Sequence, residues 1–186
     1  MRVVVIEPPQ PVVTLVEAKK HLIVEHSDDD TLIETYILAA TTWLDGPAGR
    51  LGRALGVQVL EWQSCAWPCK DFRLPYPPEI EVVSVRYIDP DGVAQVWPFP
   101  TPLYFDDLPA LRGRDGDLKI RYRAGYGTAS GDPVVWTNAV PAPIKVAIMM
   151  LVHQWYHTRS PVVVGATVET LPFAVEALLS PFRVYR

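Results

Sequence analysis

Two histidines stand at a spacing that could bind a metal ion. His153 and His157 are one helical turn apart in the run His-Gln-Trp-Tyr-His, and histidines at i and i+4 are a common zinc pair. A metalloprotease also needs a glutamate directly after the first histidine to activate the metal-bound water, and Gln154 cannot accept a proton. We therefore expect both imidazoles to flank a packed helix face as hydrogen-bonding groups. A metal-dependent hydrolase using His153 and His157 remains the alternative function.

Two charged clusters have both a functional and a structural interpretation. A calcium loop alternates its oxygen ligands and closes with a distal glutamate, so the consecutive carboxylates of Asp28–Asp30 instead predict a helix start, where they meet the positive end of the helix dipole. Lys119, Arg121 and Arg123 alternate with apolar residues. This is typical of the solvated face of a strand, although a binding module for an acidic partner would place cations in the same way.

Motifs for other catalytic chemistry are absent from the sequence. It contains no nucleophile elbow or phosphate-cradling loop, and Gly125-Tyr126-Gly127 lacks the third glycine and the following helix of a dinucleotide site. Cys65 and Cys69 match neither a redox pair nor half of a four-ligand zinc site, which favours a reducing compartment. We expect no catalytic residue, no cofactor and no metal, and hence a protein that is not an enzyme.

Composition narrows the class of protein. The 186 residues include 17 basic and 21 acidic ones, for a net charge of -4, whereas nucleic-acid binding favours a basic excess. Hydrophobic residues make up 49% and charged residues 20%, as in soluble globular domains. The apolar run 3–6 is too short for a signal-peptide core, and no window reaches the roughly 18 apolar residues of a membrane helix. We expect a soluble protein in cytosol-like conditions, without membrane contact.

Helices are predicted toward both ends of the chain. The capping-box pattern of Thr14 and Glu17 starts a short helix, a second runs from about 27 to 46, a long one lies near 143–158, and a short one covers 173–179. The apolar faces expected for the second and the long helix are Leu32, Tyr36, Ala39 and Trp43, and Ile144, Ala147, Ile148, Leu151, Val152 and Trp155.

Strands are predicted between these helices. A period-two pattern begins at Val57 and recurs over 118–123, and residues 80–88 form a β-branched stretch between them. The run Asp89-Pro90-Asp91-Gly92 is built from turn-forming residues and predicts a hairpin with 93–97. Residues 128–140, rich in Gly, Ser, Thr and Pro, are expected to form a loop.

The expected architecture is therefore α+β, a small helical bundle with a β-rich insertion. The helical frame comprises 14–46 and 141–180, the insertion covers about 57–126, and the whole chain 1–186 forms one domain. A tail of residues 181–186 remains; it is either a frayed terminus or a docking segment. Aromatic and arginine side chains are enriched at protein interfaces. The candidate docking residues are Phe182, Arg183, Val184, Tyr185 and Arg186.

Several short motifs resemble one family along nearly the whole chain. The opening Thr14-x-x-Glu17-Ala18-Lys19-x-His21-Leu22, with acidic residues before a second helix, resembles the head-to-tail connector, or adaptor, proteins of long-tailed phages and of phage-derived gene transfer particles. Later segments that resemble the family include Gly49-Arg50-Leu51-Gly52-Arg53, Gln58-x-x-Glu61-Trp62, Tyr122-x-Ala124-Gly125-Tyr126-Gly127, Trp155-Tyr156-x-x-Arg159 and Pro181-Phe182-Arg183. The stretches 97–109 and 128–140 depart from the family's pattern.

This resemblance implies a structural, non-enzymatic protein of a virion or phage-like particle. It would form a ring of about twelve copies, assembled in the bacterial cytoplasm. The ring would sit between the portal protein of a DNA-filled head and the next neck protein, a stopper or tail-completion protein. DNA would pass through the channel without sequence-specific binding, since a net negative charge repeated around the ring weakens adhesion. The tail would become ordered as it docks on the portal.

Overall fold

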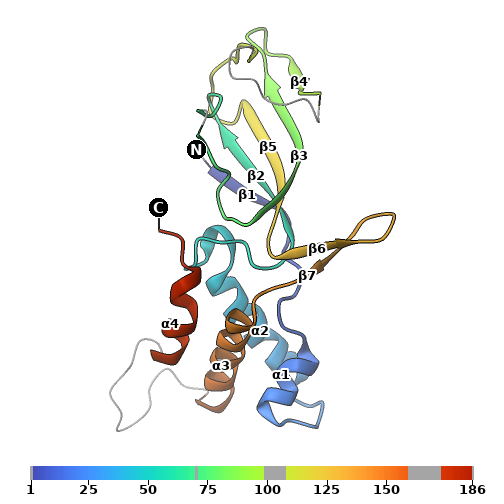
Figure 1. Cartoon of the computed structure of the whole chain (residues 1–186), viewed down its shortest axis with the longest axis vertical. Helices are drawn as coiled ribbons and strands as arrows, with labels where there is room; N and C mark the ends of the chain where they lie inside the picture. Colours follow the sequence, from blue (N-terminus) through green and yellow to red (C-terminus); the bar gives the residue numbers. More distant parts are fainter. Residues whose placement is uncertain (1, 70, 99–107, 159–172, 186) are drawn as a thin grey trace.

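The computed structural model describes residues 2–69, 71–98, 108–158 and 173–185. Within these ranges a sheet occupies one end of an elongated molecule, helices occupy the other, and a hairpin projects from the joint between them (Figure 1). The α+β prediction is confirmed. No helix in this part of the chain has the length and apolar character needed to cross a membrane. Arg159, Arg186 and the proline-rich stretch 99–107 lie outside the described residues.

The helical half contains the predicted helices. They are α1 (Leu15–Leu22), α2 (Asp30–Leu44), α3 (Ala142–Thr158) and α4 (Phe173–Leu179). The predicted capping box starts α1: Thr14 Oγ1 accepts a hydrogen bond from the Glu17 amide at 3.2 Å, and Glu17 Oε2 accepts one from the Thr14 amide at 2.8 Å. Each side chain thus satisfies a backbone donor that the first helical turn leaves unpaired.

The buried face of α2 lies one residue away from the predicted face. Ala39 is exposed, and Tyr36 and Trp43 are half-buried at the edge of the core. The buried side chains of α2 are those of Ile33, Ile37, Ala40, Thr41 and Leu44. The prediction was wrong because it placed large aromatics at the centre of the face, whereas close packing against α3 brings aliphatic and small side chains to the contact.

Five antiparallel strands form the main sheet in the order β1-β2-β5-β3-β4. They are β1 (Arg2–Glu7), β2 (Gln58–Ser64), β3 (Glu79–Ile88), β4 (Ala94–Val96) and β5 (Leu118–Ala124). The hairpin between β3 and β4 follows the predicted turn. Strand β1 was not predicted; it pairs with β2, so the sheet includes a strand from outside the 57–126 segment.

Residues 128–140 form most of a second hairpin rather than the expected loop. Strands β6 (Gly127–Ser130) and β7 (Val135–Asn138) pair antiparallel, and the hydroxyls of Thr128 and Thr137 lie 3.1 Å apart across the strands. The prediction was wrong because Gly, Ser, Thr and Pro are common both in long loops and in hairpins exposed on two faces.

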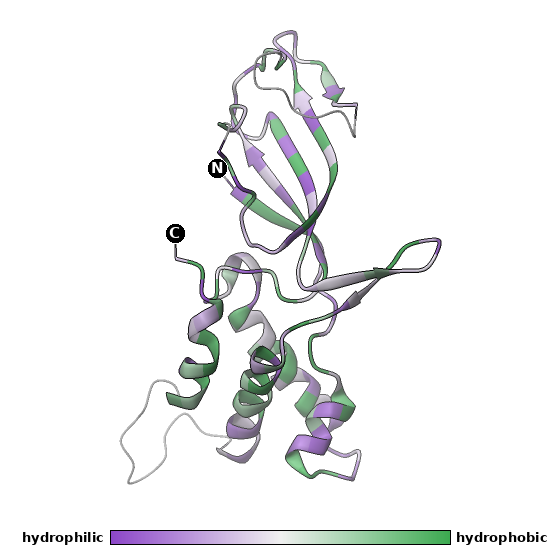
Figure 2. Ribbon diagram, viewed as in Figure 1, coloured by the Kyte–Doolittle hydropathy of each residue, from purple (hydrophilic) through white to green (hydrophobic). Residues whose placement is uncertain are grey.

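Each half has its own apolar core. The helical core contains Ile33, Leu44, Ile144 and Ile148 among its fully buried side chains. The sheet core contains Leu60, Trp62, Leu118 and Tyr122. Figure 2 shows the contrast: hydrophobic colour dominates α3, whereas strands of the sheet alternate between hydrophobic and hydrophilic residues.

Candidate interaction surfaces

The C-terminal segment folds back onto the body of the protein. After α4 comes a 3₁₀ turn, η2 (Ser180–Phe182), and the Phe182 side chain packs against the helical core. Arg53 Nε donates to the Phe182 carbonyl at 2.5 Å, and the Val184 amide donates to the Leu51 carbonyl at 2.9 Å. The expectations of a frayed terminus and of a segment ordered only by docking are therefore wrong for Phe182 to Val184.

The outer end of this segment presents an aromatic side chain. Arg183 Nη2 donates to Glu176 Oε2 at 3.1 Å, and a side-chain hydrogen bond with Tyr185, together with the charge of Glu176, raises the pKa of Arg183 above its ordinary value. Tyr185 is 80% exposed. Of the candidate docking residues within the described ranges, Tyr185 is thus the one that offers most of its side chain to another molecule.

Two of the three cations of β5, Arg121 and Arg123, are paired with carboxylates on the neighbouring strands, whereas Lys119 is exposed. Arg121 Nε donates to Glu61 Oε2 at 2.6 Å, and Arg123 Nε donates to Glu81 Oε1 at 2.9 Å. Burial acts to raise the pKa of Glu61, but the hydrogen bonds from Arg121 and Gln63 outweigh it and lower that pKa below its ordinary value. Because their charges are neutralised within the sheet, these arginines do not favour a binding module for an acidic partner.

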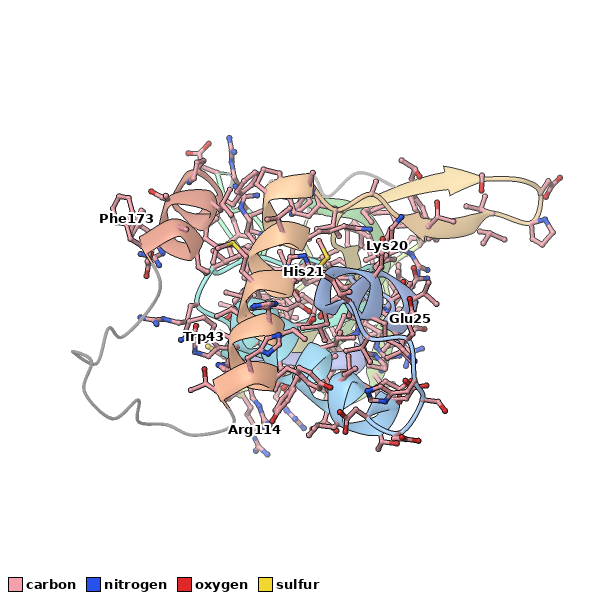
Figure 3. The ribbon with its side chains drawn as sticks, turned by 90° about the horizontal axis from the view of Figure 1, so that it is seen from below. Lys20, His21, Glu25, Trp43, Arg114 and Phe173 are labelled. Atoms are coloured by element: carbon pink, nitrogen blue, oxygen red, sulfur yellow. The ribbon has the colours of Figure 1, made fainter. Side chains whose placement is uncertain are left out.

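The two histidines of α3 lie on its exposed surface. Their ring centroids are 4.3 Å apart, and His21 of α1 lies 5.7 Å from His153, on the side of α1 that faces α3 (Figure 3). Desolvation, and then the charges of His157 and His21, lower the pKa of His153. Among the described residues, no group of three or more His, Cys, Asp or Glu side chains could hold a metal ion. Nothing in this arrangement favours the hydrolase.

The side chains of two aspartates at the start of α2, Asp29 and Asp30, connect this helix to other helices. Asp29 occupies the N-cap position without a side-chain capping bond. Its Oδ2 accepts from Tyr156 Oη at 2.5 Å, and Asp30 Oδ1 accepts from Lys19 Nζ at 2.5 Å. These bonds tie the start of α2 to α3 and α1, a tertiary role that the dipole argument did not predict.

A buried carboxylate that the sequence did not single out lies at the joint between the halves. Asp45 follows α2 and is 7% exposed. Its Oδ1 accepts from the Leu55 amide at 2.5 Å and its Oδ2 accepts from Gln58 Nε2 at 3.0 Å. Burial raises the pKa of Asp45 to about 6, against the opposing effect of these hydrogen bonds. Since Gln58 begins β2, the carboxylate links the last turn of α2 to the sheet.

This combination of a helical end, an antiparallel sheet and a projecting hairpin is similar to the fold of proteins from gene transfer agent (GTA) particles. A chain from the neck of an empty GTA particle with C6 symmetry matches with a TM-score of 0.74 and 23% identity, over 100% of this chain and 97% of that chain. A chain from the virion of a native GTA particle matches with a TM-score of 0.73 and 23% identity. A chain from the neck of a native GTA particle with C12 symmetry matches with a TM-score of 0.63 and 21% identity. Both matches cover 100% of this chain and 97% of the other chain. No known protein family and no curated protein matches the sequence.

Proposed function

We propose that this chain is a structural subunit of the neck of a GTA or related phage-type particle, and that it acts there as a head-to-tail adaptor without enzymatic activity. The observation that carries the proposal is the full-length similarity of fold, at a TM-score of 0.74, to a chain of a GTA neck. The connector motifs in the sequence support the same role independently of the fold.

The adaptor would work as a ring of identical subunits. Two of the similar chains come from necks with C6 or C12 symmetry, and heterologous contacts between neighbours close such a ring by rotation. The ring, of about twelve copies, would bind the portal protein on one side and a stopper or tail-completion protein on the other. The net charge of -4 per subunit would weaken adhesion of the DNA that passes through the channel.

The exposed end of the tail is the proposed contact with the portal protein. The hydrogen bonds of Phe182 and Val184 hold the base of the tail, so these residues would lose little conformational freedom when the tail binds the portal. Preordering of this kind lowers the entropic cost of binding. An exposed tyrosine such as Tyr185 suits an anchor that fills a pocket on a partner.

Deletion of the gene from the producing cells tests the adaptor role. We expect DNA-filled heads without tails, and we expect the purified chain, added to these heads, to restore tail attachment. Electron microscopy of purified particles gives the numbers of tailed and tailless heads. Normally tailed particles from the deletion strain would overturn the proposal.

Substitution of Tyr185 tests the docking contact separately. We expect Tyr185→Ala to reduce the number of rings attached to tailless heads by at least about tenfold, because a small loss of binding free energy is repeated at every subunit of the ring. Phe173→Ala is the matched control, since Phe173 is 85% exposed on α4 and projects outward (Figure 3). Attachment at the wild-type level by Tyr185→Ala would return the tail to a purely intramolecular role.

A further inference from the structure

The β6–β7 hairpin has an anchored base and an exposed tip. The Val57 amide donates to Asn138 Oδ1 at 2.9 Å, and Asn138 Nδ2 donates to the Pro11 carbonyl at 2.8 Å. Residues 130–135 at the tip are all exposed, including Val134 at 59% and Val135 at 57%. Because two strands alone are at best marginally stable in water, a hairpin with an exposed apolar tip indicates contact with another molecule.

A groove of about 780 Å³ lies beside the chain ends. It is lined by Arg2, Val3, the segment 72–79 and Val184. Figure 1 shows the C-terminus on the side of the molecule opposite the hairpin, close to the level of the joint between sheet and helices. The hairpin and the groove therefore occupy opposite flanks at similar positions along the molecule's long axis.

The two surfaces are complementary in charge and in polarity. Arg2 and Arg73 are exposed on the groove and form no ion pair with any residue in the described ranges, and Glu79 is the groove's one carboxylate. The hairpin has no cation and one carboxylate, Asp132, which is exposed at its tip. The apolar lining consists of Val3, Phe72, Leu74, Pro75, Pro77, Pro78 and Val184, with Tyr76. Proline has no N–H to leave unpaired when an apolar tip covers it.

We propose that the β6–β7 hairpin of one subunit occupies this groove on the next copy of the chain. Asp132 would lie against Arg2 and Arg73, and Val134 and Val135 against the apolar lining. A patch and its counterpart on opposite flanks have the geometry of a heterologous contact that closes a ring. The inference rests on the proposed ring. Because Val184 lines the groove, the neighbour's hairpin would also press on the base of the tail, so that ring closure supports portal docking.

Charge reversal tests the contact on whole particles. We expect Asp132→Arg alone, and Arg2→Glu with Arg73→Glu alone, to lower the amount of this protein per particle by at least about tenfold, because like charges then face each other. The variant with all three changes should recover the wild-type amount of this protein per particle. Asp91→Arg, at the exposed turn before β4, is the control and should assemble normally. Normal assembly of both reversed variants, or no recovery in the combined one, would overturn the contact.

Cross-linking gives a second measurement that does not depend on weakened assembly. In a background of Cys65→Ser and Cys69→Ser, which removes the two exposed free cysteines, Val134→Cys and Leu74→Cys are introduced together. Oxidation of assembled particles should yield a ladder of covalent multimers, whereas a mixture of the two single-cysteine variants should stop at dimers.

The outcomes separate this inference from the adaptor proposal. Particles that carry the protein but give no ladder would overturn the hairpin contact and leave the adaptor role intact. A cross-link from the groove cysteine to a portal or other neck protein would assign the groove to that partner and overturn the contact as well. Particles from wild-type cells that lack the protein altogether would overturn both proposals.

Discussion

The helical half and the sheet half satisfy their polar groups in different ways. A helix satisfies its own backbone groups, so α2 and α3 can meet through almost wholly apolar faces. The sheet packs one face into its core, and on the opposite face Glu61–Arg121 and Glu81–Arg123 pair across strands. Cross-strand pairs stabilise one register over others. We therefore expect the helical half to respond mainly to lost volume and the sheet half to respond to lost volume and to lost charge.

The largest effect is expected from Trp62→Ala in the sheet core. Trp62 is 1% exposed and its ring centroid lies 4.6 Å from that of Phe72, so truncation should lower the free energy of unfolding by about 3–5 kcal/mol. Trp155→Ala is the matched change in the helical half. Trp155 is half-buried against Tyr36 at the edge of the core. Its truncation should therefore lower the free energy of unfolding by only about 1–2 kcal/mol. Urea unfolding measures both, and equal losses would contradict this ranking.

The next effect concerns the joint between the halves and depends on pH. The pKa of Asp45 is raised from 3.8 to about 6, so between these values the folded state holds a proton that the unfolded state releases. This contribution to stability is complete below about pH 3.8 and is lost as the pH rises through about 6, a change of about 3 kcal/mol.

Asp45→Asn isolates this contribution from those of other titrating groups. The asparagine keeps one acceptor for the Leu55 amide, and Gln58 can rotate its amide to match the new donor. Relative to wild type, the variant should therefore gain stability as the pH is raised from 4 to 7.5. Parallel pH profiles of unfolding free energy for the two proteins would show that Asp45 does not titrate in this range.

A smaller effect is expected from the ion pairs on the sheet. Arg121→Ala leaves the buried Glu61 carboxylate without its cation and should cost about 2 kcal/mol at neutral pH. Arg123→Ala should cost less than about 1 kcal/mol, because its partner Glu81 is exposed and screened by water. The measurement is denaturant unfolding at low and high salt. Similar losses for the two variants would show that burial of Glu61 does not set the strength of its pair.

The smallest effect is expected on the surface of α3. Replacing both His153 and His157 by alanine should change the unfolding free energy by no more than about 0.5 kcal/mol, because both side chains are exposed. Particle assembly should also remain intact. Zinc bound near one equivalent in the wild-type protein, together with its loss from the double variant, would instead favour the metal-dependent hydrolase.

The sequence by itself determined the elements whose signals are local. The capping box of Thr14 and Glu17, the alternation along β5 and the turn before β4 involve residues a few positions apart, and the structure shows each where it was predicted. The length of α3 follows in the same way from a proline-marked start and a sustained apolar period. Such interactions form within a single turn or strand, so they can be predicted without knowledge of the partner surface.

Only the tertiary structure decided which surfaces those elements meet. Strand β1 is ordered by β2, more than fifty positions away, the tail is held by Leu51 and Arg53, and Asp45 is buried by residues of the following strand. The one-residue rotation of the buried face of α2 has the same origin. The free energy of burial depends on the area and shape of the opposing surface, which no periodicity within one segment contains.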